Sequence, residues 1–228
     1  MKKSKEERHF MKKESRRYSL GEEVFNAVSH GVGALLGVVG ASVLVTLAAC
    51  FADGVTVAAC LVYGLSLVLL YTMSTLYHAF PAAGLKDLFR IFDHSTIYLL
   101  IAGSYTPFCL ILLRGTEKGK VIFAALWAAA VVGVVLNAIS VEKFKYLSLI
   151  LYVVMGWAAV FAIRDIAAAL PPVGFWLLVG GGLSYTGGIL FYVAKKRPYA
   201  HSIWHLFVLG GSILHYLCIL LYVLPTAF

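Results

Sequence analysis

Long apolar runs separated by short polar segments are the main pattern along the chain. Apolar residues dominate seven stretches, which lie at residues 26–50, 55–79, 91–113, 121–140, 146–169, 174–194 and 199–224. A helix needs about 20 such residues to cross the hydrocarbon core of a bilayer, and every stretch reaches that length. The pattern therefore predicts an all-α integral membrane protein, with a seven-helix bundle in one domain over residues 21–228.

The segments between these runs are short and contain residues that break helices. Ala52-Asp53-Gly54 follows the first run, Pro81 follows the second, and Pro171-Pro172 precedes the sixth. Helices joined by short connections pack as antiparallel neighbours, so we expect each run to lie beside the next one.

The composition agrees with a lipid environment. Of 228 residues, 61% are hydrophobic and only 13% are charged, whereas about 25% of a soluble domain is charged. The net charge of +8 raises the alternative of a basic arm that binds nucleic acid. However, eight of the nineteen basic residues precede the first apolar run, as an anchor beside anionic lipid would require. We therefore expect a membrane lipid as partner and no nucleic acid.

The basic residues also predict the orientation. If the N-terminus is cytoplasmic, fifteen of the nineteen lysines and arginines lie on the cytoplasmic side and four lie outside. This imbalance is what the positive-inside rule describes. We expect residues 1–20 to form a basic cytoplasmic tail and the seventh helix to end outside.

Polar residues inside apolar runs are costly and often functional. His201 and His205 begin the seventh run, and their spacing of four places both imidazoles on one face of a helix. His78 ends the second run, and Asp93 lies near the start of the third. The predicted topology brings all four to the same face of the membrane, with Ser74 one helical turn deeper than His78.

Three imidazoles with an open fourth position suit zinc. The sequence therefore predicts a zinc site at His78, His201 and His205. Asp93 could hold a water molecule and accept its proton as a general base. Ser74 could orient that water or stabilise an oxyanion. In the alternative interpretation these groups only form hydrogen bonds between helices.

Four further polar residues lie within the apolar runs. His30, together with Asn26, either lines the same cavity or serves helix packing. His215 lies too far along the seventh helix to join the site, so we expect an interhelical hydrogen bond there. Asn137 is expected to connect helices in the same way.

The histidine, serine and aspartate pattern resembles that of the hemolysin III family, which is related to the progestin and adiponectin receptors and to the alkaline ceramidases. The similarity spans about residues 20 to 225. It is carried by S-x-x-x-H at Ser74 to His78, Asp93, H-x-x-x-H at His201 to His205, Glu23-Val24-Phe25-Asn26-Ala27-Val28-Ser29-His30-Gly31, Phe92-Asp93-His94-Ser95-Thr96-Ile97-Tyr98 and Ala102-Gly103-Ser104-Tyr105-Thr106-Pro107. The resemblance implies a seven-helix fold in the bacterial plasma membrane, with zinc on the cytoplasmic side bound by the three histidines. It also implies a water held by Asp93 and chemistry like that of an amide-lipid hydrolase.

Three functions remain open at this stage. The first is a zinc-dependent hydrolase of lipid amide or ester bonds, related to ceramidases. The second is a receptor-like or membrane-homeostasis protein with a structural zinc and no catalysis. The third is a cytolytic pore, as the family name suggests. The substrate and the oligomeric state are not predicted.

Overall fold

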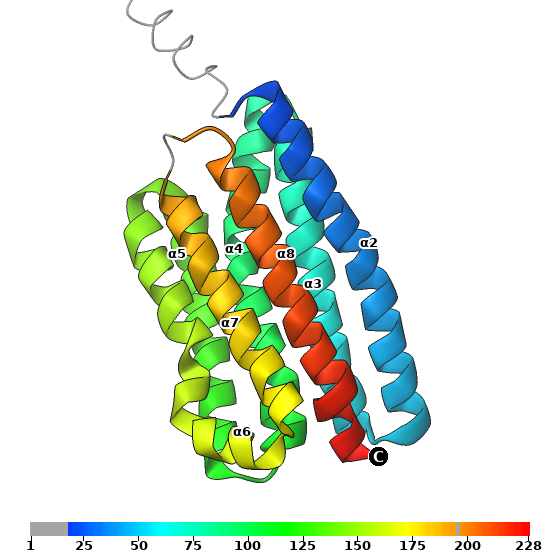
Figure 1. Ribbon diagram of the computed structural model, residues 1–228. Coiled ribbons are helices and arrows are strands. Elements are labelled where there is room, and N and C mark those ends of the chain that lie inside the picture. The colour runs from blue at the N-terminus through cyan, green and yellow to red at the C-terminus, as the bar shows by residue number, and fades with distance from the viewer. Residues whose placement is uncertain (1–17, 195–196) are drawn as a thin grey trace, which may run out of the picture.

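The computed structural model describes residues 18–194 and 197–228, and every regular element in these two ranges is a helix (Figure 1). The prediction of an all-α protein is confirmed. Most of the predicted basic tail, residues 1–17, lies outside the described residues, as do Lys195 and Lys196.

Within residues 18–194 and 197–228 the bundle contains seven α-helices, and π- and 3-10 segments extend some of them. The α-helices are α2 (Leu20–Phe51), α3 (Gly54–Ala79), α4 (Ala83–Pro107), α5 (Glu117–Gly156), α6 (Ile163–Ala169), α7 (Pro172–Val193) and α8 (Ala200–Cys218). The π segments are η1 (Phe108–Leu112) and η3 (Ile219–Val223), and the 3-10 segments are η2 (Ala158–Ala162) and η4 (Leu224–Ala227). In the described part of the chain, six helical runs are long and apolar enough to cross a membrane, so the protein is a multi-pass membrane protein.

Side-chain caps fix where several helices begin. The Ser19 hydroxyl accepts a hydrogen bond from the Glu22 amide, and the Glu22 carboxylate accepts one from the Ser19 amide. This capping box satisfies backbone donors that the first turn of α2 leaves free. Asp53 caps α3 in the same manner by accepting from the Thr56 amide at 2.9 Å.

The long helix α5 reverses direction at Ser140. This residue has an extended backbone with φ −171° and ψ 108°. The Ser148 hydroxyl donates to the Asn137 side-chain oxygen at 3.2 Å. Eleven residues of straight helix would hold these side chains about 16 Å apart. The two arms of α5 are therefore antiparallel, and the predicted role of Asn137 in connecting helical segments is confirmed.

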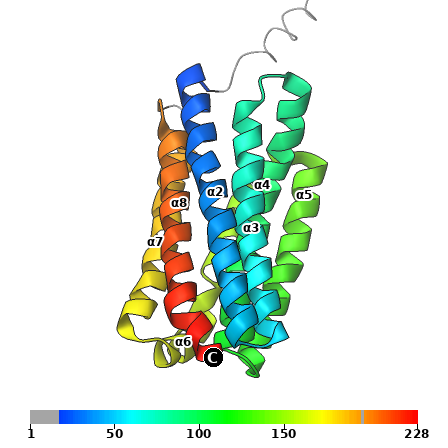
Figure 2. The ribbon, with the colours of Figure 1, turned by 90° about the vertical axis from the view of Figure 1, so that its right-hand side faces the viewer.

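The helices pack so that the first and last lie together. Figures 1 and 2 show α2 running beside both α3 and α8, while α7 lies on the other side of α8. Large apolar side chains face outward along the bundle, for example Leu35 and Leu190, each 70% exposed. In water this exposure would be costly, but in a bilayer these faces contact lipid.

Ion pairs show which connections meet at each end of the bundle. Near the start of α2, Arg90 Nη2 lies 2.9 Å from Glu142 Oε2. At the opposite end, Arg114 Nη2 lies 2.6 Å from Asp53 Oδ2. These two ion pairs show that the connections alternate between the two ends, as expected for antiparallel neighbours. At the first end, hydrogen bonds from Lys145 and Arg90 lower the pKa of the Glu142 carboxyl to about 2.

Candidate metal centre

The start of α8 places two histidines on one helical face. Tyr199, which precedes the helix, has a left-handed backbone with φ 56°. Non-glycine residues rarely adopt this conformation. Its amide donates to Glu22 Oε1 at 2.8 Å, which ties the beginning of α8 to the first turn of α2. His201 and His205 then lie one turn apart, with their Nε2 atoms separated by 3.1 Å.

His78 joins this pair from the end of α3. The helix ends at Ala79 because Phe80 is extended and Pro81 follows. Possible ligand atoms of His78, His201 and His205 all lie within 4.8 Å of one another. His78 and His205 are buried, and His201 is partly exposed. The structure therefore brings together the three histidines that the sequence analysis selected.

A carboxylate fixes the protonation of His78. Glu23 Oε2 lies 2.7 Å from His78 Nδ1, and an ionised carboxylate can only accept a hydrogen bond. Nδ1 therefore carries a hydrogen, and in the neutral imidazole the lone pair is on Nε2. His78 Nε2 is buried and has no hydrogen-bond partner among residues 18–194 and 197–228. A buried imidazole in this state presents a metal ligand, because histidine ligands commonly donate their other N–H to a carboxylate.

The three histidines can hold a metal ion. Zinc bound tetrahedrally by imidazoles at about 2.0–2.1 Å separates its ligand nitrogens by about 3.3 Å. The Nε2 atoms of His201 and His205, 3.1 Å apart, are close to that spacing. A set of three neutral nitrogen donors suits zinc and other first-row transition metals more than calcium or magnesium, which prefer oxygen.

One cavity, with a volume of about 110 Å³, connects most of the predicted site residues. Ser74, Asp93, His201 and His205 all line it, although His78 does not. The Ser74 side chain is buried, and its hydroxyl has no hydrogen-bond partner in the part of the chain that the structure describes. Such a volume has room for several water molecules or for part of a ligand.

Asp93 lies on α4, beside a histidine that is oriented by its own helix. His94 Nδ1 lies 2.9 Å from the Arg90 carbonyl oxygen and 3.5 Å from Asp93 Oδ2. The carbonyl can only accept, so Nδ1 carries a hydrogen that also faces the carboxylate. His94 lines the cavity but is not one of the three clustered histidines.

His30 lines the cavity as well. Its ring stacks on that of His205, with centroids 3.6 Å apart and an interplanar angle of 16°. Both nitrogens of His30 are buried and have no hydrogen-bond partner among the described residues. Asn26 has the other predicted role, because its side-chain oxygen accepts from the Ser202 hydroxyl at 2.7 Å across the contact between α2 and α8. His30 therefore lines the cavity, and Asn26 serves the packing of α2 against α8.

Away from the histidines the cavity is mainly apolar and continues towards a second one of about 60 Å³. Both cavities are lined by Tyr105, Gly156, Gly182 and His215. His215 Nε2 donates to the Leu178 carbonyl at 3.1 Å, which confirms the interhelical hydrogen bond predicted for it. Apolar space therefore extends from the histidine cluster towards the other end of the bundle.

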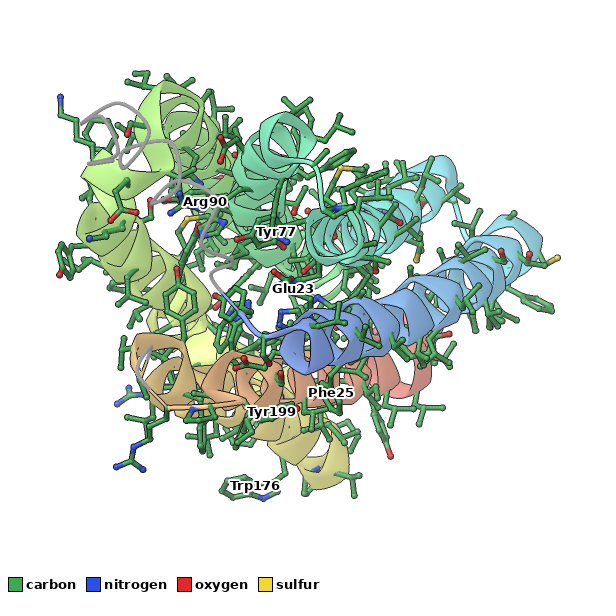
Figure 3. The ribbon with its side chains drawn as sticks, turned by 90° about the horizontal axis from the view of Figure 1, so that it is seen from above. Glu23, Phe25, Tyr77, Arg90, Trp176 and Tyr199 are labelled. Atoms are coloured by element: carbon green, nitrogen blue, oxygen red, sulfur yellow. The ribbon has the colours of Figure 1, made fainter. Side chains whose placement is uncertain are left out.

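Glu23 is the site residue that the sequence analysis missed. Figure 3 looks along the bundle from the end where α2 begins, and it places Glu23 and Tyr77 towards the middle, with Trp176 at the periphery. In the sequence Glu23 is an acid in a first helical turn, which the helix dipole favours, and it begins one of the segments that resemble the hemolysin III family, but neither signal assigns it a partner. Only the packing of α2 against α3 reveals its partner.

Comparison with known proteins identifies the family of the chain. The family described as Haemolysin-III related matches residues 18–216. The chain is 44% identical to Hemolysin-3 of Bacillus cereus, over 90% of this chain and 94% of the relative. It is 40% identical to the Hemolysin-3 homolog of Bacillus subtilis (strain 168), over 92% and 99%. The human monocyte to macrophage differentiation factor is 30% identical over 73% of this chain and 72% of its own length. The chain therefore belongs to the haemolysin-III-related family.

Proposed function

We propose that the protein is a zinc-dependent hydrolase that cleaves an amide or ester bond of a membrane lipid. The observation that carries the proposal is the orphaned, buried Nε2 of His78 facing a cluster with His201 and His205. The possible ligand atoms of these three histidines lie within 4.8 Å of one another, close enough for one metal ion to bind all three. The adjoining cavity with Asp93 and Ser74 on its wall supports a reaction site rather than a purely structural metal.

Bound zinc would polarise the carbonyl of the scissile bond and lower the pKa of a water molecule bound to the metal. Asp93 accepts the proton of the attacking water as the new bond to the carbonyl carbon forms. It then returns that proton to the leaving nitrogen or oxygen as the amide or ester bond breaks. The Ser74 hydroxyl, which has no partner among the described residues, donates to the oxyanion that develops on the carbonyl oxygen.

The apolar part of the cavity supports a lipid as substrate. Leu100, Ile101 and Val208 contribute to its walls, and the second cavity extends the apolar space. A hydrocarbon chain there would remove apolar surface from water, so its burial favours binding. The polar end of the same lipid would lie beside the histidines.

The proposal includes the membrane arrangement. The two arms of α5 count as separate crossings, which gives seven spans, with the N-terminus cytoplasmic and the C-terminus outside. The reversal at Ser140 and the clustering of basic residues at the end where α2 begins support this topology. The location proposed is the plasma membrane of a bacterium, in keeping with the Bacillus relatives.

Cytolysis is the second candidate, because the relative from Bacillus cereus is named Hemolysin-3. A water-filled pore would need polar surface along several spans. The large exposed side chains of the described spans are mainly apolar, which favours a resident membrane enzyme.

The experiment compares metal content and lipid hydrolysis in three proteins purified in detergent. Wild type should contain about one zinc and release fatty acid from a lipid amide or ester. Asp93→Asn should keep the metal and lose at least about 100-fold in turnover, in line with the loss of a general base. The double variant His201→Ala/His205→Ala should lose both. Equal turnover in wild type and Asp93→Asn would contradict the catalytic role and favour a structural metal.

A further inference from the structure

We propose that Glu23 is a positioning residue for the metal site, and that it acts by holding His78 in the tautomer that leaves Nε2 as the metal ligand. This role rests on the proposed metal site, and it affects the affinity for the metal rather than the rate of lipid hydrolysis. It depends on a contact that joins the start of α2 to the end of α3 and the start of α4.

The Glu23 carboxylate lies between two donors. Its Oε2 is 2.7 Å from His78 Nδ1, and its Oε1 is 2.8 Å from Lys86 Nζ. The His78 side chain is fully buried and that of Glu23 is 9% exposed, so water contributes little to this arrangement. A buried carboxylate requires such partners, because an unpaired charge there would be strongly destabilising.

Lys86 is itself held in place from α3. Its ammonium donates to the Tyr77 carbonyl at 3.1 Å and lies 5.0 Å from the centre of the Tyr77 ring. Lys86 therefore fixes one oxygen of Glu23, which leaves the other oxygen directed at His78. The first turns of α2 and α4 together set the orientation of a ligand on the last turn of α3.

The role of Glu23 depends on having two acceptor oxygens. A glutamine at this position has one acceptor and one donor group, but it would face two donors. If its oxygen turned to Lys86, its NH₂ group would meet His78 Nδ1 and move the imidazole hydrogen to Nε2. If its oxygen turned to His78, its NH₂ group would face the ammonium of Lys86. In the first orientation the metal loses a ligand, and in the second the ion pair becomes a donor–donor contact.

The test measures zinc affinity by chelator competition on the purified full-length protein in detergent. Glu23→Gln should bind zinc about 10- to 100-fold more weakly than wild type, the range seen when partners of metal ligands are removed. Adding Lys86→Met to Glu23→Gln should restore part of this affinity, because the amide oxygen is then free to accept from His78 Nδ1. A residue that only stabilised the fold would not show this rescue.

Glu142→Gln provides the matched control. Glu142 is also a paired carboxylate at this end of the bundle, but its partners are Arg90 and Lys145. Its substitution should leave zinc affinity unchanged. If Glu23→Gln does not fold, Glu23→Asp, one methylene shorter, should still bind zinc more weakly than wild type.

Wild-type affinity in Glu23→Gln, or in Glu23→Asp if that variant has to be used, would overturn the role of Glu23. So would a loss that Lys86→Met does not relieve. Failure of the proposed function is distinguishable, because in that case wild type itself would bind no zinc or would bind zinc without hydrolysing lipid.

Discussion

The Tyr105 hydroxyl stabilises a break in helical structure inside the bundle. It donates to the Gly156 carbonyl at 2.7 Å and accepts from the Ala159 amide at 2.9 Å. These backbone groups lie where α5 ends and η2 begins. Backbone groups at membrane depth must be satisfied within the protein, and Tyr105 does this for two of them.

Tyr105→Phe should therefore destabilise the protein by about 2 kcal/mol or more, because the exposed Gly156 carbonyl and the part-buried Ala159 amide both lose a partner at a depth where lipid offers no other. Thermal unfolding in detergent would measure the loss. Tyr63→Phe is the matched control, since the Tyr63 hydroxyl is buried and has no hydrogen-bond partner within the described residues. Removing it should be neutral or stabilising. Equal effects of the two substitutions would contradict the role assigned to Tyr105.

The three clustered histidines could be predicted because each is a rare polar group in an apolar run, and its position relative to the membrane follows from the charge pattern. Glu23 could not be predicted in the same way. Acids are common in the first turn of a helix, and the identity of its partner depends on how α2 packs against α3. For His30, the depth in the membrane could be predicted from the sequence, but its stacking on His205 could not.

At the scale of elements, neighbouring glycines of α7 have different tasks. A Cβ at Gly181 would overlap the imidazole of His215, so the absence of a side chain permits close contact between α7 and α8. A Cβ at Gly182 would meet nothing within 4 Å. This second glycine lines both cavities and leaves their junction open.

Gly181→Ala should displace His215 and break its hydrogen bond to Leu178, at a cost of about 1–3 kcal/mol. Gly182→Ala should be neutral or stabilise the helix by about 0.5–1 kcal/mol, because alanine is the better helix former. Thermal unfolding of the two variants in one detergent would compare them. A Gly182→Ala protein as unstable as Gly181→Ala would refute the distinction.

The apolar runs predicted that the chain is helical, but they did not predict where each helix begins. Helix α4 begins at Ala83, whereas the apolar run was predicted from residue 91, and α2 begins at Leu20 rather than near residue 26. The apolar pattern reports contact with lipid, but a helix continues beyond the hydrocarbon where its backbone hydrogen bonds remain favourable. The polar residues Lys86 and Arg90 occupy such an extension of α4.

The reversal within α5 was predictable for a related reason. Glu142, Lys143 and Lys145 interrupt the apolar pattern, and they lie two to five residues after the extended residue Ser140. No proline or glycine marks this turn, so its backbone geometry could not be predicted from the sequence.

At the scale of the whole molecule, the alternation of connections gives a direct test of the proposed topology. Lys143 lies at the end where α2 begins, and Lys118 lies at the other end. Single cysteines introduced at these positions, with Cys50 replaced by alanine, can be labelled with a maleimide that does not cross membranes. Lys118→Cys should be labelled in intact cells, and Lys143→Cys only after permeabilisation. The reverse pattern would invert the orientation.

The histidine cluster also has a consequence for biosynthesis. Residues 78 and 201 are 123 positions apart, so at about 5–20 residues per second the ribosome adds the second ligand roughly 6–25 s after the first. Glu23 and Lys86 are synthesised early, close to His78. The α2–α3–α4 part can thus arrange one ligand before α8 exists, and insertion of the last helix completes the centre. Metal loading would accordingly report that the whole chain has been inserted.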